Sequence, residues 1–256
     1  MIIVLTFAIT GAGFSLFYLL SCKITVEKMS APTATLADEL REKQIELETK
    51  FLPKEAVALM QSENEKLQST SIIESALAVG AKAPEFELTD SKTKKPFNSN
   101  KALEKGPLAV VFYRGGWCPY CNVANKALQR RYTDIEAAGG QLVVIAPETP
   151  ENVEQTATEN ELSFPALSDP NSDVARRFGL VFQLTAELDN LYTKGFKLDL
   201  RVRNGSDKAE LPLPATYIIA QDGTVAHRYV DVDYKRREEP ALIVAKLQEL
   251  AGKAQQ

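Results

Sequence analysis

Two cysteines, Cys118 and Cys121, are the residues best suited to chemistry in this chain, and Pro119 and Tyr120 separate them. An apolar run and two glycines precede the pair, and a proline suits the first position of a helix because its missing N–H would have no partner there. Cys118 would then cap the helix, where free N–H groups and the helix dipole favour a thiolate over a thiol. Cys121 would follow three residues later on the same helix face, at a spacing that a disulfide can bridge. The pattern predicts a pair that cycles between dithiol and disulfide.

Two other interpretations of the pair are possible. A zinc site would need two further ligands, and only Cys22, His227 and carboxylates could supply them. A second cysteine pair is absent, since the chain has three cysteines and one histidine. Two buried structural thiols would also fit, although a strand, two glycines, Cys-Pro-x-Cys and a helix are a demanding combination. We therefore expect redox chemistry, with no cofactor and no metal.

The elements that must position this pair alternate between strands and helices. Apolar runs and alternating patterns predict strands at 86–88, 108–113, 141–146, 212–219 and 224–230, with Asp222-Gly223 as the turn between the last two. Periodic segments predict helices at 119–138, 148–160, 170–178 and 240–250. This alternation with one terminal hairpin predicts an α/β fold built on a mixed sheet.

The composition is that of an ordinary globular protein. The chain has 256 residues, 45% of them hydrophobic and 25% charged, which is enough to bury a sizeable core. A formal net charge of -4 and a pI of about 5.3 provide no basic surface, so we expect no nucleic-acid partner. Three cysteines are too few, and odd in number, for a disulfide-stapled secreted scaffold.

The first 28 residues form an apolar segment with no charge before Lys23. Residues 1–22 are long enough to cross a membrane as a helix, and they end on Leu-Leu-Ser-Cys22, which resembles a lipoprotein cleavage site. No Lys or Arg precedes the apolar run, which is unusual for a signal peptide. Three interpretations stay open: translation from Met29, a membrane anchor, and a lipidated Cys22. The first cations follow the run and favour a cytoplasmic main domain, with membrane contact only if residues 1–22 are retained.

Two regions complete the predicted organisation. Residues 29–74 have apolar residues at helical spacing, interrupted at Pro53, and predict a helical extension. Its apolar stripe suits a lid on the main domain, which we favour, or a docking or dimer-contact arm. Residues 75–256 form the main domain. Within it, 183–211 breaks the alternation, and we interpret this stretch as an insertion near the site or at a dimer contact.

Several motifs occur together in the main domain: Val79-Gly-Ala-Lys-Ala-Pro-Glu-Phe-Glu-Leu88, Phe112-Tyr113, Phe164-Pro-Ala-Leu-Ser-Asp169, Val174-Ala-Arg-Arg-Phe-Gly179, and Tyr217-Ile-Ile with Asp222-Gly223. On these motifs the sequence resembles the peroxiredoxin-like AhpC/TSA family of the thioredoxin-fold superfamily, over roughly residues 75–250. The resemblance implies a thioredoxin-like fold, with a mixed central sheet flanked by helices, and here an N-terminal helical extension. The Cys-Pro-Tyr-Cys motif itself is identical to that of many glutaredoxins.

The family pattern also implies roles for individual residues. Aligned at Phe112-Tyr113, Cys121 takes the place of the peroxidatic cysteine, Cys118 that of a threonine, and Arg114 that of a proline. The family's distant arginine aligns with Pro214, which looks like the cis-proline that faces the cysteine pair in thioredoxins. Arg114 would restore a cation beside the thiols, or else contact backbone or a carboxylate. We assign substrate binding to Arg114, Trp117, Tyr120, Pro214 and Thr216, although packing alone is the stronger interpretation of Trp117.

The alignment and the local electrostatics favour different nucleophiles. The alignment names Cys121, whereas the helix cap favours Cys118, which we expect to be the more exposed thiol. We treat the two as a pair and favour Cys121 for the peroxide step. The favoured function is a thiol peroxidase that reduces hydrogen peroxide or organic hydroperoxides and is regenerated by thioredoxin, glutaredoxin or glutathione. A thioredoxin-like protein-disulfide oxidoreductase and a non-catalytic redox sensor are the alternatives, and formation of a homodimer stays open.

Overall fold

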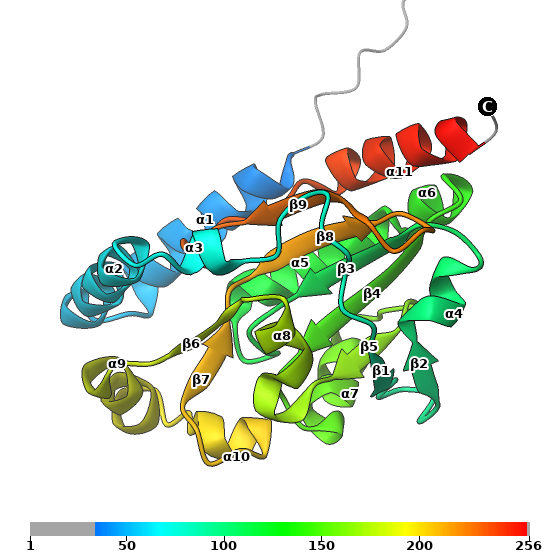
Figure 1. Ribbon diagram of the computed structural model, residues 1–256. Coiled ribbons are helices and arrows are strands. Elements are labelled where there is room, and N and C mark those ends of the chain that lie inside the picture. The colour runs from blue at the N-terminus through cyan, green and yellow to red at the C-terminus, as the bar shows by residue number, and fades with distance from the viewer. Residues whose placement is uncertain (1–33, 255–256) are drawn as a thin grey trace, which may run out of the picture. The chain divides into compact units, whose positions relative to one another are not determined.

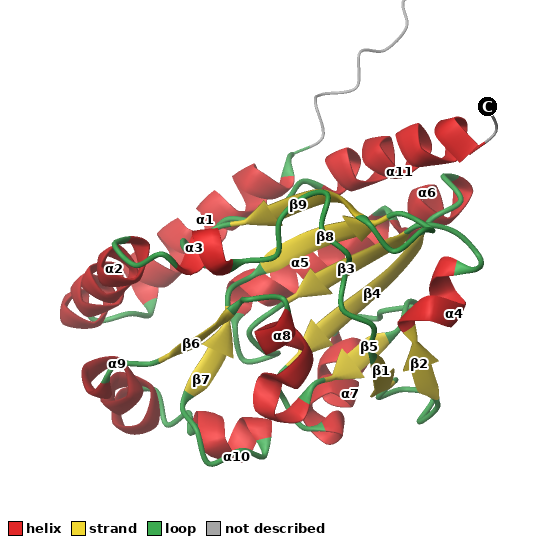
Figure 2. Ribbon diagram, in the orientation of Figure 1, coloured by secondary structure: helices red, strands yellow, loops and turns green. Residues whose placement is uncertain are grey.

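A five-stranded mixed sheet organises the chain, of which the computed structural model describes residues 34–254 (Figures 1 and 2). The strand order is β5-β4-β3-β8-β9, so β3 is central. β4 runs parallel to β3 and β5, whereas β8 is antiparallel to β3 and β9. The bounds are Leu108–Phe112 for β3, Gln141–Ala146 for β4, Ala166–Ser168 for β5, Ala215–Ile219 for β8 and Val225–Val230 for β9. The predicted α/β fold with a mixed sheet is confirmed.

The predictions for residues 1–28, including the fate of Cys22 and a start at Met29, lie outside the described residues. None of the helices in residues 34–254 combines the length and the hydropathy that a membrane span requires.

The central strand β3 is buried on both faces of the sheet. Ala109 and Val111 pack into one core layer, whereas Leu108, Val110 and Phe112 pack into the layer on the opposite face. All five residues are buried. This is why the strand reads as a continuous apolar run and not as an alternation of apolar and polar residues.

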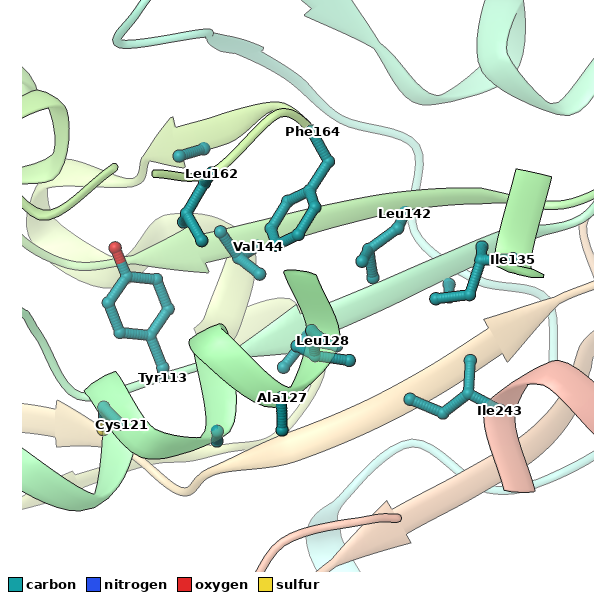
Figure 3. Packing of buried hydrophobic residues seen from close by; sticks show 14 of the residues in the cluster. Tyr113, Cys121, Ala127, Leu128, Ile135, Leu142, Val144, Leu162, Phe164 and Ile243 are labelled. Carbon is teal, nitrogen blue, oxygen red and sulfur yellow. The ribbon is translucent and has the colours of Figure 1, made fainter. Parts of the chain in front are cut away.

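Helices cover both faces of this sheet. The first layer contains side chains from α5 (Pro119–Arg130), α6 (Tyr132–Ala137), α7 (Pro150–Glu159) and α11 (Pro240–Ala254). Figure 3 shows Leu128, Ile135, Phe164 and Ile243 in this layer, which also contains Cys121 near the start of α5. The second layer contains side chains from α4 (Ser99–Leu103) and α8 (Asp173–Arg177), the latter preceded by the short 3-10 helix η1 (Pro170–Ser172).

Two predicted elements are divided in the structure. The helix predicted at 119–138 is two helices, because the backbone leaves helical geometry at Arg131 (φ -109°, ψ 8°). The strand predicted at 212–219 is split into β7 (Glu210–Pro212) and β8, since Pro214 has no N–H to donate to a neighbouring strand.

Two short strands change the expected edge of the sheet. The strand predicted at 86–88 is β1 (Glu87–Thr89), and it pairs with β2 (Pro96–Asn98) in a separate hairpin. The place next to β4 is taken by β5, which the sequence pattern did not predict. Three residues are too short a run for a periodic signal.

The N-terminal extension consists of α1 (Leu36–Lys50), α2 (Lys54–Gln68) and α3 (Ile72–Ser75), and Pro53 separates the first two as expected. Leu36 and Leu40 are buried in the core layer that contains α5. Both oxygens of the Glu239 carboxylate accept hydrogen bonds from backbone N–H groups of the first turn of α1, at 2.8 and 3.1 Å. This packing agrees with a lid, while the domain boundary at 74/75 stays a prediction.

The insertion is closed by its own two strands. β6 (Val181–Gln183) pairs antiparallel with β7, and between them lie α9 (Ala186–Asn190), the π-helix η2 (Leu191–Gly195) and α10 (Leu200–Asn204). Buried residues such as Leu188, Tyr192 and Leu200 form a small core of its own. Partly buried Trp117 packs against this core, so the insertion reaches the start of α5.

Candidate active site

The cysteine pair lies where β3 ends and α5 begins. Gly115 has a φ of 143°, a conformation that a side chain would strain, and the chain turns there. The N–H of Gly116 donates to the Glu148 carboxylate at 2.7 Å. Cys118 is the N-cap of α5 and Pro119 its first residue, as the motif predicts.

Both cysteines are free and buried, with 2% of Cys118 and none of Cys121 exposed. Nη2 of Arg237 lies 3.3 Å from Sγ of Cys121 and donates a hydrogen bond to it. Burial by itself raises the pKa of Cys121, but the hydrogen bond with Cys118, the charge of Arg237, and the backbone N–H and charge of Arg114 outweigh burial. They hold the pKa of Cys121 well below its ordinary value.

The other sulfur has the opposite shift. The hydrogen bond with Cys121, burial, and the negative charge on Cys121 all raise the pKa of Cys118. The geometry thus favours a thiolate on Cys121 and a thiol on Cys118. The cap position alone would have favoured Cys118, but Arg237 lies against Cys121 and donates a hydrogen bond to its sulfur.

A pocket of about 310 Å³ opens beside Cys118, and we call it the thiol pocket. Leu47 of α1 and Leu52 of the loop between α1 and α2 form one wall. Phe196 and Leu198 of the insertion form another. Cys118 lines this pocket and Cys121 does not. Cys118 is therefore the more accessible sulfur, as expected, but the lid and the insertion leave it far less exposed than a bare helix cap would.

Arg114 is buried among aromatic rings next to the pair. Its guanidinium carbon lies 4.4 Å from the ring centre of Tyr234, 5.1 Å from that of Trp117 and 5.9 Å from that of Tyr192. Its Nη2 donates a hydrogen bond to the Tyr192 hydroxyl. Within the described residues it pairs with no carboxylate, so the contact considered as an alternative is not made there. The ring faces stabilise the buried charge instead.

The remaining predicted site residues lie at different distances from the sulfurs. Trp117 and Tyr120 both line the thiol pocket, where Trp117 packs on Tyr192 and Tyr120 on Tyr234. Thr216 is buried within β8, opposite Val111 of β3 and Tyr229 of β9, and it lines neither the thiol pocket nor the pocket that contains Pro214.

Pro214 differs from its prediction. No cis peptide bond occurs in the part of the chain that the structure describes, so the expectation of a cis-proline is wrong. The insertion fixes the backbone just before it, because β7 pairs with β6 up to Pro212 and the Leu213 N–H donates to the Leu180 carbonyl at 2.8 Å. Pro214 faces a second pocket, which also contains Arg114.

Arg237 is the site residue that the sequence did not identify. It comes from the loop between β9 and α11, 116 residues after Cys121. Its Nη1 donates to the backbone carbonyls of Tyr234 and Arg236, which fixes the guanidinium. The signal that could have found it is the run Lys235-Arg236-Arg237 in the loop that follows the last strand.

A buried acid ties the turn to the insertion. Glu148 is fully buried, accepts the Gly116 N–H, and forms an ion pair with Arg203 of α10 at 2.5 Å. Burial raises the pKa of this carboxyl, and the Gly116 N–H and the Arg203 charge oppose the rise. The insertion therefore anchors the loop that presents the cysteines.

No cluster of three or more His, Cys, Asp or Glu side chains in residues 34–254 could hold a metal ion. His227, considered above as a zinc ligand, is paired with Glu238 at 2.7 Å.

Known proteins share this sequence pattern and fold. The model of the AhpC/TSA family matches residues 79–228. Peroxiredoxin bcp of Haemophilus influenzae is 30% identical over 104 residues, which are 41% of this chain and 66% of that protein, so the match spans just under two thirds of the relative.

Two solved structures show the same fold at low identity. Peroxidoxin BcpB from Mycobacterium tuberculosis has a TM-score of 0.53 at 19% identity, over 68% of this chain and 98% of that one. A peroxiredoxin-like protein from Aquifex aeolicus has a TM-score of 0.54 at 17% identity, over 68% of this chain and 88% of that one.

Proposed function

The chain belongs to the AhpC/TSA family, whose model matches more than half of its length, and we propose that it is a thiol peroxidase acting through Cys121 and Cys118. Its substrate would be hydrogen peroxide or an organic hydroperoxide. The observation that carries the proposal is the 3.3 Å hydrogen bond from Arg237 to the buried sulfur of Cys121. A cation in contact with a buried thiol favours the ionised form, and the thiolate is the nucleophile.

The proposed cycle has three balanced steps. The Cys121 thiolate attacks one oxygen of the hydroperoxide, the O–O bond breaks, and the leaving alkoxide or hydroxide takes up a proton, which gives a sulfenic acid. The sulfur of Cys118 then attacks the sulfenic sulfur, a disulfide forms, and water leaves with the proton of Cys118. An external dithiol supplies two electrons and two protons to restore both cysteines.

The protonation state of Cys118 suits it to both steps. While Cys121 is ionised, Cys118 stays a thiol and does not compete for peroxide. Once Cys121 is a sulfenic acid, its negative charge no longer raises the pKa of Cys118, so Cys118 can give up its proton and attack. The hydrogen bond between the two cysteines holds it next to its target. Cys121 is fully buried, so peroxide would enter through the thiol pocket and pass Cys118.

Peroxide consumption tests this function. Purified protein with a thioredoxin system should consume hydrogen peroxide or cumene hydroperoxide, and the Cys118→Ser, Cys121→Ser double variant should not. Equal consumption by both proteins would remove the peroxidase proposal.

One observation favours a second function, a thioredoxin-like protein-disulfide oxidoreductase. The sulfur that lines the open pocket is that of Cys118, the first cysteine of the Cys-Pro-Tyr-Cys motif. In this function Cys118 would exchange with an external disulfide. Rapid reduction of a model protein disulfide by the dithiol form, with negligible peroxide consumption, would select this function over the first.

The proposed cycle also implies partners and a compartment. Thioredoxin, glutaredoxin or glutathione would attack the Cys118 sulfur of the disulfide, because that sulfur faces the pocket and the departing Cys121 thiolate is stabilised by Arg237. The cycle needs a compartment that supplies thiol reductants, so we place the protein in the cytoplasm. Cell fractionation tests this location, and sedimentation of the purified chain tests whether it forms a homodimer.

A further inference from the structure

A second pocket, of about 190 Å³, lies next to the thiol pocket, and Arg114, Tyr192 and Tyr234 line both. We call it the arginine pocket. Its walls come from α2, the insertion and the end of β7, and they are largely apolar, with Leu184, Leu188, Leu213 and Val232 among the lining residues.

Arg114 brings a buried charge to this apolar pocket. Only 3% of Arg114 is exposed, and its Nη2 donates a hydrogen bond to the Tyr192 hydroxyl. Its Nε is buried without any partner. A buried cation without an anion is costly, and the negative charge of a thiolate at Cys118 or Cys121 would act on Arg114.

The acid at the rim of the arginine pocket does not neutralise Arg114. The Glu63 carboxylate accepts hydrogen bonds from Lys66 at 2.6 Å and from the Thr185 hydroxyl at 2.5 Å. Its charge is therefore already paired, and the Lys66 side chain at the mouth is 61% exposed. The rim adds no net repulsion toward an incoming anion.

From these observations we propose that the arginine pocket binds an organic monocarboxylate, with the carboxylate against Arg114 and the hydrocarbon chain among the leucines. Charge complementarity identifies the head group, and the apolar walls identify the tail. Because Arg114 also faces Cys121, the bound carboxylate and the Cys121 thiolate share one cation. The sharing, but not the site, rests on the proposed ionisation of Cys121.

Sharing a cation has a direct consequence. The carboxylate and the Cys121 thiolate compete for the charge of Arg114, and they repel each other. The carboxylate therefore binds more tightly when Cys121 carries no charge. Formation of the Cys118–Cys121 disulfide removes that charge. The oxidised protein is therefore the form that binds the carboxylate best.

The fluorescence of Trp117 provides the assay. It is the single tryptophan of the chain, and it packs on Arg114 and Tyr192. Reduced protein is titrated with octanoate and with octanamide, which has the same chain but no charge. We expect a saturable change with octanoate, and binding of octanamide that is weaker by about tenfold or more, the usual effect of a charge-assisted hydrogen bond.

Three variants complete the test. Leu188→Phe fills the arginine pocket and should abolish the fluorescence response to octanoate. Leu198→Phe narrows only the thiol pocket, so the response to octanoate should be the same as in the wild type. Cys121→Ser should bind octanoate several-fold more tightly than the reduced wild type. We change the charge of the ligand and do not substitute Arg114, because removal of a buried cation that also faces Cys121 would disturb the whole site.

Two results would overturn the carboxylate site: equal binding of octanoate and octanamide, or an unchanged octanoate response in Leu188→Phe. No gain in affinity in Cys121→Ser would overturn the sharing of Arg114 between the two anions. The titration uses no peroxide. A protein that binds octanoate but does not consume peroxide would therefore contradict only the proposed function. A protein that consumes peroxide but does not bind octanoate would contradict only the carboxylate site.

Discussion

Replacing Arg237 by methionine tests the origin of the Cys121 thiolate. Methionine keeps most of the length of the side chain and removes its charge, which lies 3.3 Å from the sulfur through Nη2. At an effective dielectric constant near 20, two charges about 4 Å apart interact by about 4 kcal/mol. At about 1.4 kcal/mol per pKa unit, this sets an upper limit of about three units.

The full limit will not be reached, because Arg114 and its backbone N–H stay in place beside Cys121. We therefore expect Arg237→Met to raise the pKa of Cys121 by about one to two units, within the usual range for loss of an adjacent opposite charge. The rate of peroxide reduction at neutral pH should fall about tenfold for each unit by which the pKa exceeds the pH of the assay.

The assay is the pH dependence of alkylation by iodoacetamide, with the modified cysteine identified by mass spectrometry. Arg236→Met is the matched control, since the Arg236 side chain is 69% exposed and pairs with Asp231 and Asp233. The control should titrate like the wild type. If Arg237→Met and Arg236→Met gave the same pKa for Cys121, the assignment of the thiolate to contact with Arg237 would be refuted.

Three further predictions concern stability. The pKa of Cys121 is depressed in the folded protein, so below about pH 8.5 the unfolded chain binds a proton that the folded chain has released. The free energy of unfolding of the reduced protein should therefore fall as the pH falls from about 8.5 to the folded pKa, by up to about 1.4 kcal/mol per pH unit. Urea unfolding should show this slope in wild type and not in Cys121→Ser; parallel slopes would contradict it. Glu239→Ala removes the carboxylate that accepts two N–H groups of α1, and should cost about 1 kcal/mol and speed hydrogen exchange in 36–50, with unchanged exchange as the adverse result. Gly116→Ala would place a Cβ 1.9 Å from the Thr156 hydroxyl and should destabilise the folded protein by about 1–3 kcal/mol in thermal unfolding. The control is Gly252→Ala, whose added Cβ would have no atom within 4 Å and should not destabilise the protein. Equal melting temperatures of the two variants would contradict the packing around Gly116.

Local sequence predicted the part of the fold on which the cysteine motif depends. The strand before the pair, the turn at its glycines and the helix that begins at Pro119 are all set by neighbouring residues, through burial, backbone freedom and capping. The helices on either side of Pro53 were predictable for the same reason. The three-residue strands β2 and β5 were not, because their pairing depends on distant partners.

The electrostatics of the site depend on contacts that no local pattern encodes. Arg237 reaches Cys121 from 116 residues away, and Tyr192 reaches Arg114 from the insertion. The helix-cap argument considered only the partial charges of α5 and therefore favoured Cys118. Pro214 was misjudged for a related reason, because strand pairing inside the insertion sets the backbone before it.

The most direct test of the central claim is the position of the first oxidation. Cys118→Ser and Cys121→Ser are each exposed briefly to hydrogen peroxide and a sulfenic-acid trap, and the labelled residue is identified by mass spectrometry. The account predicts a rapid label on Cys121 in Cys118→Ser and almost none on Cys118 in Cys121→Ser. A rapid label on Cys118, with Cys121 unreactive, would contradict it.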